Sequence, residues 1–297
     1  MTAGYLMRKI HVLTAEADRS LTRLVVVLLA PCLAFDFIVG NEVLAHPANW
    51  ILPPILGFGS VVLGIMAARV GAQIFGIKGE TKRRTFVYTT SLQNYGYIPL
   101  PLCAALFDRD TMGVLFAFVL GVEIAFWTVA LWQLTGHAER GSWWRAVNPP
   151  MVAIPVAILL NSLSAEKWIP AAVDSTFHLL GACAVPMALL LSGALIADHL
   201  NKVSLRHGTR TICAATVIRI GVVPLLILLF ARFVPLDHSL KAVLVLQAAM
   251  PAAIFPIVVT KAHEGDVPVA LQVVIGTSLI GLVTIPLWLG FGLHWVL

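Results

Sequence analysis

Two apolar segments contain prolines at positions that do not suit a continuous helix, and both segments also carry amide side chains. Residues 92–101 read LQNYGYIPLP and residues 247–256 read QAAMPAAIFP. A proline inside a helix removes one backbone donor and clashes with the preceding turn, whereas proline suits the first turn of a new helix. We therefore predict two half-helices in each segment, joined by an unwound link. A plain proline kink is the alternative interpretation.

An unwound link inside an apolar segment can bind a polar ligand. Its free backbone groups must be buried in protein or line a wet cavity, and the N-terminal end of a half-helix favours an anion. Gln93 and Asn94 add neutral hydrogen-bond donors. The candidate substrate-binding residues are Gln93, Asn94, Tyr95, Gly96, Pro99, Pro101, Gln247, Met250, Pro251 and Pro256.

Charged side chains inside other apolar segments are candidates for ion coupling, because such charges are costly. Glu123 is a candidate carrier of a coupling proton; the alternatives are an ion pair with Arg219 and a hydrogen bond to a neighbouring helix. Arg219 is a candidate attractor of an anion, or it pairs two helices. Asp36 is a candidate second proton or cation site, although its shallow position favours a structural role. Arg69 lies near the end of its segment, where a long side chain reaches the membrane surface.

The elements that carry these residues are predicted to be transmembrane helices. The chain has 297 residues, of which 59% are hydrophobic and 12% charged, against about 25% charged in soluble domains. This composition excludes a water-soluble enzyme or a nucleic-acid-binding protein, despite the net charge of +5. We predict an all-α polytopic membrane protein, with spans of about 20 residues. Nine spans are predicted, at about 22–40, 51–75, 84–107, 112–134, 147–164, 170–197, 211–231, 242–260 and 267–293.

The distribution of basic residues predicts the orientation. Fourteen Lys and Arg residues fall on the side that bears residues 1–21, and four fall on the other side. Because basic loops stay in the cytoplasm, this side is predicted to be cytoplasmic and the C-terminus outside. The expected location is the plasma (inner) membrane.

An internal repeat is predicted at an offset of 155 residues. Pro31 falls on Pro186, Pro101 on Pro256 and Gly121 on Gly276. The repeats would be residues 1–146 and 147–297 within one integral membrane domain. Five spans per repeat is an odd number, so the second copy must be inverted, as in some secondary transporters. Residues 1–9 match only the tail of a first helix, so a complete repeat would give ten spans.

The first proline-containing segment resembles a known family. Residues 94–102, NYGYIPLPL, resemble the N-x-G-[FY]-x-G-x-P-L signature of the auxin efflux carrier family, with Pro99 standing where the family has a small residue. Met250-Pro251 followed by Pro256 is similar to the C-terminal half of that family. The resemblance covers nearly the whole chain. It implies two inverted five-helix repeats with crossed broken helices, a plan shared with sodium/proton antiporters and bile-acid symporters. It also implies transport of organic anions, namely auxins in plants and malate or malonate in bacteria.

We expect a secondary active transporter of a small mono- or dicarboxylate, linked to protons and working by alternating access. A sodium-coupled symporter of the bile-acid type is the first alternative; no Asp or Glu lies within 84–107 or 242–260 to bind sodium. A membrane sensor or an intramembrane enzyme is the second. The chain has neither H-E-x-x-H nor G-x-S-x-G, so it is not expected to be an enzyme. No cofactor, metal or nucleic acid is expected. The expected partners are the substrate anion, the lipid bilayer and a coupling proton, and a homodimer is left open.

Overall fold

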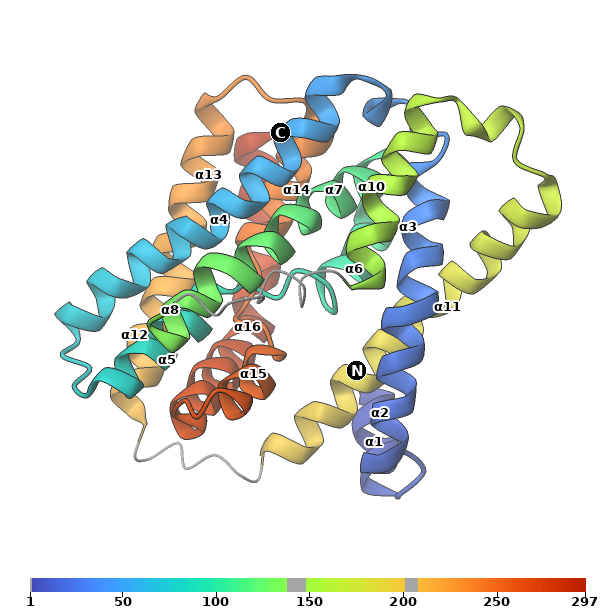
Figure 1. Cartoon of the computed structure of the whole chain (residues 1–297). Helices are drawn as coiled ribbons and strands as arrows, with labels where there is room; N and C mark the ends of the chain where they lie inside the picture. Colours follow the sequence, from blue (N-terminus) through green and yellow to red (C-terminus); the bar gives the residue numbers. More distant parts are fainter. Residues whose placement is uncertain (1, 138–147, 201–207) are drawn as a thin grey trace.

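The computed structural model describes residues 2–137, 148–200 and 208–297, and all regular elements within these ranges are helices (Figure 1). Polar or proline residues start several of them. Asp108 and Asn148, for example, accept hydrogen bonds at 2.9 and 3.0 Å from the third backbone N–H after each. The α-helices are α1 (Thr2–Lys9), α2 (Ala15–Leu24), α3 (Ala30–Ile38), α4 (Pro47–Ile74), α5 (Glu80–Ser91), α6 (Pro99–Leu106), α7 (Arg109–Ala125), α8 (Leu131–Thr135), α10 (Pro149–Ser162), α11 (Ala171–Leu200), α12 (Thr209–Thr216), α13 (Val223–Phe233), α14 (His238–Ala248), α15 (Pro256–Ala262) and α16 (Val267–Val296).

Within the described ranges, six continuous helical segments are long and apolar enough to cross a membrane. They are Glu16–Ile38, Asn49–Ile74, Arg109–Thr135, Ala171–Ala194, Thr209–Phe233 and Val267–Val296. The other three predicted spans have different forms. The segments predicted at 84–107 and 242–260 are each broken in two, and the one at 147–164 is the 14-residue α10.

Three of the long segments contain a π-helical stretch. These stretches are η1 (Val25–Leu29) between α2 and α3, η3 (Phe126–Ala130) between α7 and α8, and η6 (Val217–Val222) between α12 and α13. A π turn inserts one residue into a helix and is frequent at functional sites. Here η3 begins three residues after Glu123, and η6 contains Arg219.

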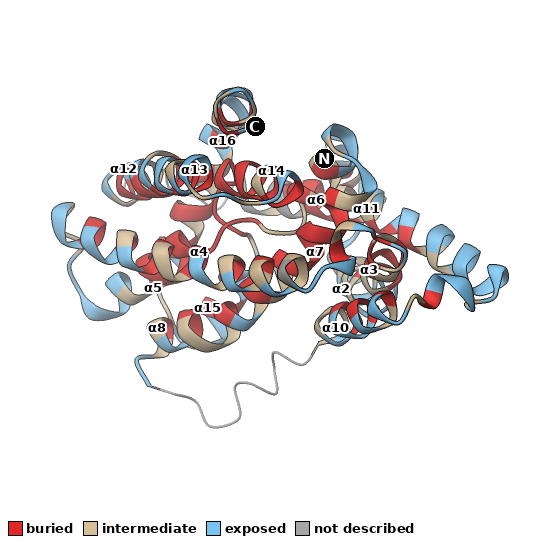
Figure 2. Ribbon diagram, turned by 90° about the horizontal axis from the view of Figure 1, so that it is seen from above, coloured by how far each residue is buried: buried red, intermediate tan, exposed pale blue. Residues whose placement is uncertain are grey.

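The helices pack in two groups. Helices α1, α2, α3, α10 and α11 contact one another, and α4 to α8 pack with α12 to α16 (Figures 1 and 2). Helix α7 belongs to the second group but also contacts α3 and α10 of the first. The span that contains α7 has the largest buried share of the six, with 61% of an apolar 18-residue stretch inside the protein. It therefore forms the centre of the core.

Glycines allow the backbones of α4 and α7 to approach closely. A Cβ on Gly57 would overlap the carbonyl oxygen of Phe118, and a Cβ on Gly121 would overlap that of Pro54. Small residues have this role in membrane helix pairs, where close packing replaces the hydrophobic effect. The contact holds α7, the helix that carries Glu123, close against α4.

Candidate functional site at the helix crossover

Both predicted helix breaks are present. Helix α5 ends at Ser91 and α6 begins at Pro99, which leaves residues 92–98 as the first link. Helix α14 ends at Ala248 and α15 begins at Pro256, which leaves residues 249–255 as the second link. The predicted half-helices are thus confirmed.

The prolines have different roles from those expected of a symmetric pair. Pro99 and Pro256 each start a half-helix, at a position where a backbone N–H would have no acceptor within the helix, so its absence in proline costs no hydrogen bond. Pro101 lies in the first turn of α6, so Pro251 alone of the four is inside a link. In the first link the break depends instead on the polar and glycine residues from Gln93 to Gly96.

The two links cross and pair as a short antiparallel bridge. The backbone N–H of Asn94 donates to the carbonyl of Pro251 at 2.8 Å, and that of Ala253 donates to Leu92 at 2.9 Å. Gln93 and Ala252 form the bridge pair between them, and both are fully buried. Backbone groups inside a membrane must be satisfied by protein where no helix satisfies them. The crossover therefore replaces part of the hydrogen bonding that the broken helices lack.

Amide side chains hold the crossover in place. The Nε2 atom of Gln93 donates to Ser60 of α4 at 2.9 Å, and that of Gln247 donates to the carbonyl of Tyr95 at 3.4 Å. Asn94 is 3% exposed, and its Oδ1 atom accepts from the backbone N–H of Ile98 at 3.3 Å. Asn94 thus stabilises the end of the first link, directly before α6. Gly96 has open space where a Cβ would stand.

Arg219 lies against the second link and is fully buried. Its Nε atom donates to the carbonyl of Met250 at 3.2 Å. Among the described residues, its Nη1 and Nη2 atoms have no hydrogen-bond partner and no carboxylate pairs with it. A buried guanidinium with two unused nitrogens carries an uncompensated charge, so the site is suited to an anion.

Glu123 forms no ion pair with Arg219, so that alternative is wrong, and the expected hydrogen bonds to neighbouring segments are present. Its Oε1 atom accepts from the hydroxyl of Tyr95 at 2.9 Å. Its Oε2 atom accepts from the indole of Trp127 at 3.0 Å and from Asn148 Nδ2 at 3.4 Å. One carboxylate therefore connects the first link, η3 and Asn148, the residue that caps the start of α10.

Asp36 lies away from the crossover, on α3. It is 6% exposed and pairs with Arg109 of α7 at 3.3 Å and with His178 of α11 at 3.2 Å. The pairing with Arg109 joins the two helix groups. This geometry agrees with the structural role that its shallow position favoured.

Buried polar atoms without a partner concentrate at the crossover. Buried polar atoms in proteins are normally bound to another protein group, to water or to a ligand, since leaving them unpaired is costly. In the described part of the chain, the unpaired atoms on or beside the links are Tyr88 Oη, Thr90 Oγ1, Gln93 Oε1, Arg219 Nη1 and Nη2, and Gln247 Oε1.

Sequence reasoning missed several residues of this region. Thr277 of α16 accepts from the backbone N–H of Ala252 at 3.2 Å, and nothing in the sequence around it indicates this contact. The sequence around Trp127 likewise does not indicate its hydrogen bond to Glu123. Asn148 is different, because an asparagine followed by two prolines is typical of a helix start. Its second role, as a donor to Glu123, depends on the tertiary fold.

Comparison with known proteins finds similarity to membrane transporters. The sequence profile of a family described as Membrane transport protein matches residues 1–143 and 138–289. An uncharacterized transporter of Methanothermobacter thermautotrophicus is 23% identical over 295 residues, covering 96% of this chain and 92% of its own length. One of Methanocaldococcus jannaschii is 22% identical over 293 residues, covering 96% and 93%.

Proposed function

The chain belongs to the Membrane transport protein family, that of the auxin efflux carriers, and on this premise we propose that it carries a small organic anion across the plasma (inner) membrane. Membership makes it a multi-pass membrane transporter and not an enzyme. The proposed substrate is a mono- or dicarboxylate of the malate, malonate or auxin type. The proposed mechanism is alternating access around the crossover.

The observation that carries this proposal is the position of Arg219. Its two unpaired nitrogens lie beside a link whose backbone is already unwound. A carboxylate can accept both N–H groups of a guanidinium in one plane. Asn94, Gln93 and Gln247 supply further polar atoms within the same crossover. Because Arg219 is fully buried, the anion reaches it only after the elements packed around the crossover move.

Glu123 is the proposed site of the coupling proton. Three donors hold its carboxylate, and one of them, Tyr95, belongs to the first link. Protonation would weaken these hydrogen bonds, because a neutral carboxyl is a poorer acceptor. The charge on Glu123 would then set how tightly the first link is held to α7 and α10. Asp36 is a weaker candidate for this role.

The proposed architecture is two inverted repeats, residues 1–146 and 147–297. In support, each link has seven residues, and each is followed by a half-helix that begins with proline. The starts of these half-helices, Pro99 and Pro256, are 157 positions apart, so the local offset is two residues more than the 155 inferred from sequence. The proposed orientation has the basic connections, including residues 75–79, in the cytoplasm.

The test is flux into liposomes that contain the purified protein. Labelled malate, malonate and a panel of other carboxylates are offered with a proton gradient or a sodium gradient, each applied alone. We expect uptake of at least one carboxylate that follows the proton gradient and stops when a protonophore is added. Failure of every carboxylate would overturn the proposal, and uptake that follows sodium alone would overturn the proton coupling.

A further inference from the structure

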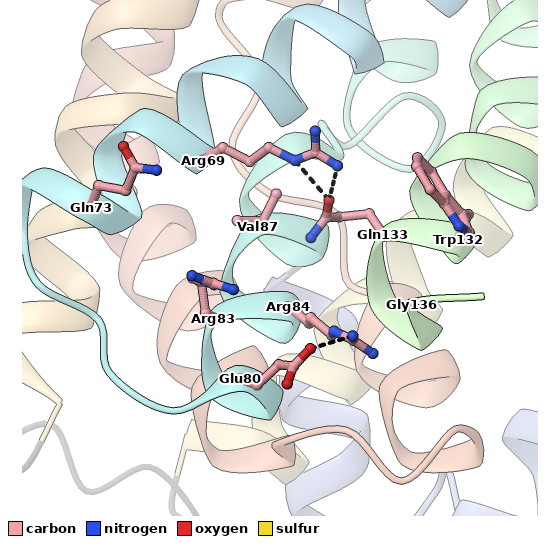
Figure 3. Close-up of a pocket in the computed structure, with 9 residues that line it drawn as sticks. All are labelled: Arg69, Gln73, Glu80, Arg83, Arg84, Val87, Trp132, Gln133 and Gly136. Carbon is pink, nitrogen blue, oxygen red and sulfur yellow. Dashed lines mark hydrogen bonds and ion pairs between the residues drawn. The ribbon is translucent and has the colours of Figure 1, made fainter.

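A polar pocket lies away from the crossover, where α4, α5 and α8 meet (Figure 3). Its volume is about 360 Å³. Arg69 comes from α4, Arg83 and Arg84 from the first two turns of α5, and Trp132 and Gln133 from α8 (Figure 3). Neither the anion site nor the coupling site proposed above includes any of these residues.

The pocket has an excess of positive charge. Three arginines line it against one acid, Glu80, which is engaged by Arg84 one helical turn away. Arg83 is exposed and forms no hydrogen bond or ion pair with any described residue. Arg69 uses its Nε and Nη2 atoms on Gln133 and keeps Nη1 free. Two guanidinium groups therefore remain available to an anion.

The protein fixes two of the arginines before any ligand binds. Gln133 holds Arg69 through an Nε to Oε1 hydrogen bond of 2.8 Å, and Arg84 donates to the carbonyl of Thr135 at 2.8 Å. Arg84 fits against this turn because the next residue is Gly136, with φ +79°; a Cβ there would overlap the guanidinium. A preorganised site loses less side-chain entropy on binding, which favours a ligand of matching geometry.

Apolar side chains beside the pocket face outward. Met66, Val70 and Ile74 are exposed by 61%, 55% and 74% and recur every four residues along α4, the helix that carries Arg69. Trp132, at the pocket itself, is 51% exposed. In a membrane protein such a stripe contacts lipid tails, and tryptophan is enriched at the level of the headgroups. The arginines therefore lie where a lipid phosphate is expected.

We propose that this pocket binds the phosphate of an anionic phospholipid. Arg69 and Arg83 donate to the phosphate oxygens, and Trp132 packs against the glycerol and the first methylenes of the acyl chains. Arginine matches phosphate geometry, and basic pockets between membrane helices bind anionic headgroups. The outward apolar stripe distinguishes a lipid from free phosphate, which would gain nothing from it. The site is independent of the transported anion.

The experiment measures lipid binding to the full chain purified in detergent. Native mass spectrometry counts bound lipid as phosphatidylglycerol, phosphatidylcholine or inorganic phosphate is added, and thermal unfolding is followed in parallel. We expect phosphatidylglycerol to bind and to raise Tm, and the other two to do neither at the same concentration. Equal binding of phosphatidylcholine, or displacement of phosphatidylglycerol by millimolar phosphate, would overturn the lipid assignment.

Two variants and a control localise the binding. Arg83→Gln removes a guanidinium that forms no hydrogen bond or ion pair with any described residue, so its effect does not come from losing such a bond within the described protein. It is expected to weaken phosphatidylglycerol binding by roughly tenfold, and Arg69→Gln combined with it by more. Arg232→Gln changes an exposed arginine in the last turn of α13 and is expected to have no effect. Unchanged affinity in Arg83→Gln, or an equal loss in Arg232→Gln, would refute the pocket as the binding site.

Discussion

The hydroxyl of Tyr95 donates a hydrogen bond to Oε1 of Glu123 at 2.9 Å, which ties the first unwound link to the central helix α7. The other carboxylate oxygen is held by Trp127 and Asn148. A change in the charge of Glu123 therefore acts at once on the crossover and on the start of α10. The proposed coupling predicts how variants of this contact behave.

Glu123→Gln is expected to uncouple transport from protons. Glutamine keeps an oxygen that can accept from Tyr95, but it cannot release or take up a proton. Uptake driven by a pH gradient should be abolished, while exchange of labelled for unlabelled substrate across the liposome membrane continues. Tyr95→Phe is the companion variant, because it removes the hydrogen bond and leaves the carboxyl. Proton-driven accumulation by Glu123→Gln at the normal level would remove Glu123 from the coupling mechanism.

Arg219→Met is expected to stabilise the fold while weakening substrate binding. The substitution removes a buried charge that no described carboxylate balances, so the free energy of unfolding should rise by about 1 kcal/mol or more. The same change removes charge-assisted hydrogen bonds to the substrate, each of about 1.5–3 kcal/mol, so KM should rise by at least roughly tenfold. Thermal unfolding and liposome uptake measure the two effects. A variant that loses stability and keeps its KM would show that Arg219 is structural.

Asn94→Ala is expected to abolish transport while the protein still inserts and folds. Its side chain supports Ile98 at the entry to α6, and its Nδ2 atom bonds to no described residue. Asn49→Ala serves as the control, because it also removes one side-chain hydrogen bond, to Val43, far along the chain from the crossover. Uptake and size-exclusion profiles are measured for both. Near-normal uptake by Asn94→Ala would exclude Asn94 as a ligand.

Asp36→Asn is expected to keep proton-driven uptake. Asp36 pairs with Arg109, which is 50% exposed, so the ion pair contributes at most about 1 kcal/mol after screening by solvent. Stability should fall by an amount in this range, as followed by thermal unfolding in detergent. If the variant instead exchanges substrate but no longer accumulates it, Asp36 belongs to the coupling mechanism and the structural interpretation is wrong.

Gly57→Ala and Gly59→Ala form a matched pair on α4. A methyl group at Gly57 overlaps the backbone of Phe118, whereas nothing lies within 4 Å of a Cβ at Gly59. Overpacking should cost Gly57→Ala about 1–3 kcal/mol, and Gly59→Ala should be neutral or slightly stabilising through helix propensity. Melting temperatures of the two purified variants test this difference. Equal Tm values would show that the contact between α4 and α7 has room for a methyl group.

Composition and proline spacing were sufficient to predict the class of protein and the position of both helix breaks. The apolar content leaves lipid as the only solvent that suits most of the surface. Pro99 and Pro256 cannot continue a helical ladder from the residues before them, so each begins a new half-helix through local chemistry that needs no distant partner. The breaks could therefore be placed from sequence, although the first one owes more to its Gln-Asn-Tyr-Gly run than to proline.

The partners at the site are decided by the tertiary structure. Gln93 pairs with Ala252, and Asn94 with Pro251, across more than half of the chain, and no local pattern fixes which backbone groups meet. The sequence offered Arg219 as a partner for Glu123, but the fold places Met250 beside the arginine and Tyr95 beside the carboxylate. Helical periodicity also cannot reveal the π turns at Phe126 and Val217, because the extra residue is accommodated by packing. Sequence thus determined which groups are buried in the membrane, and packing decided which of them meet.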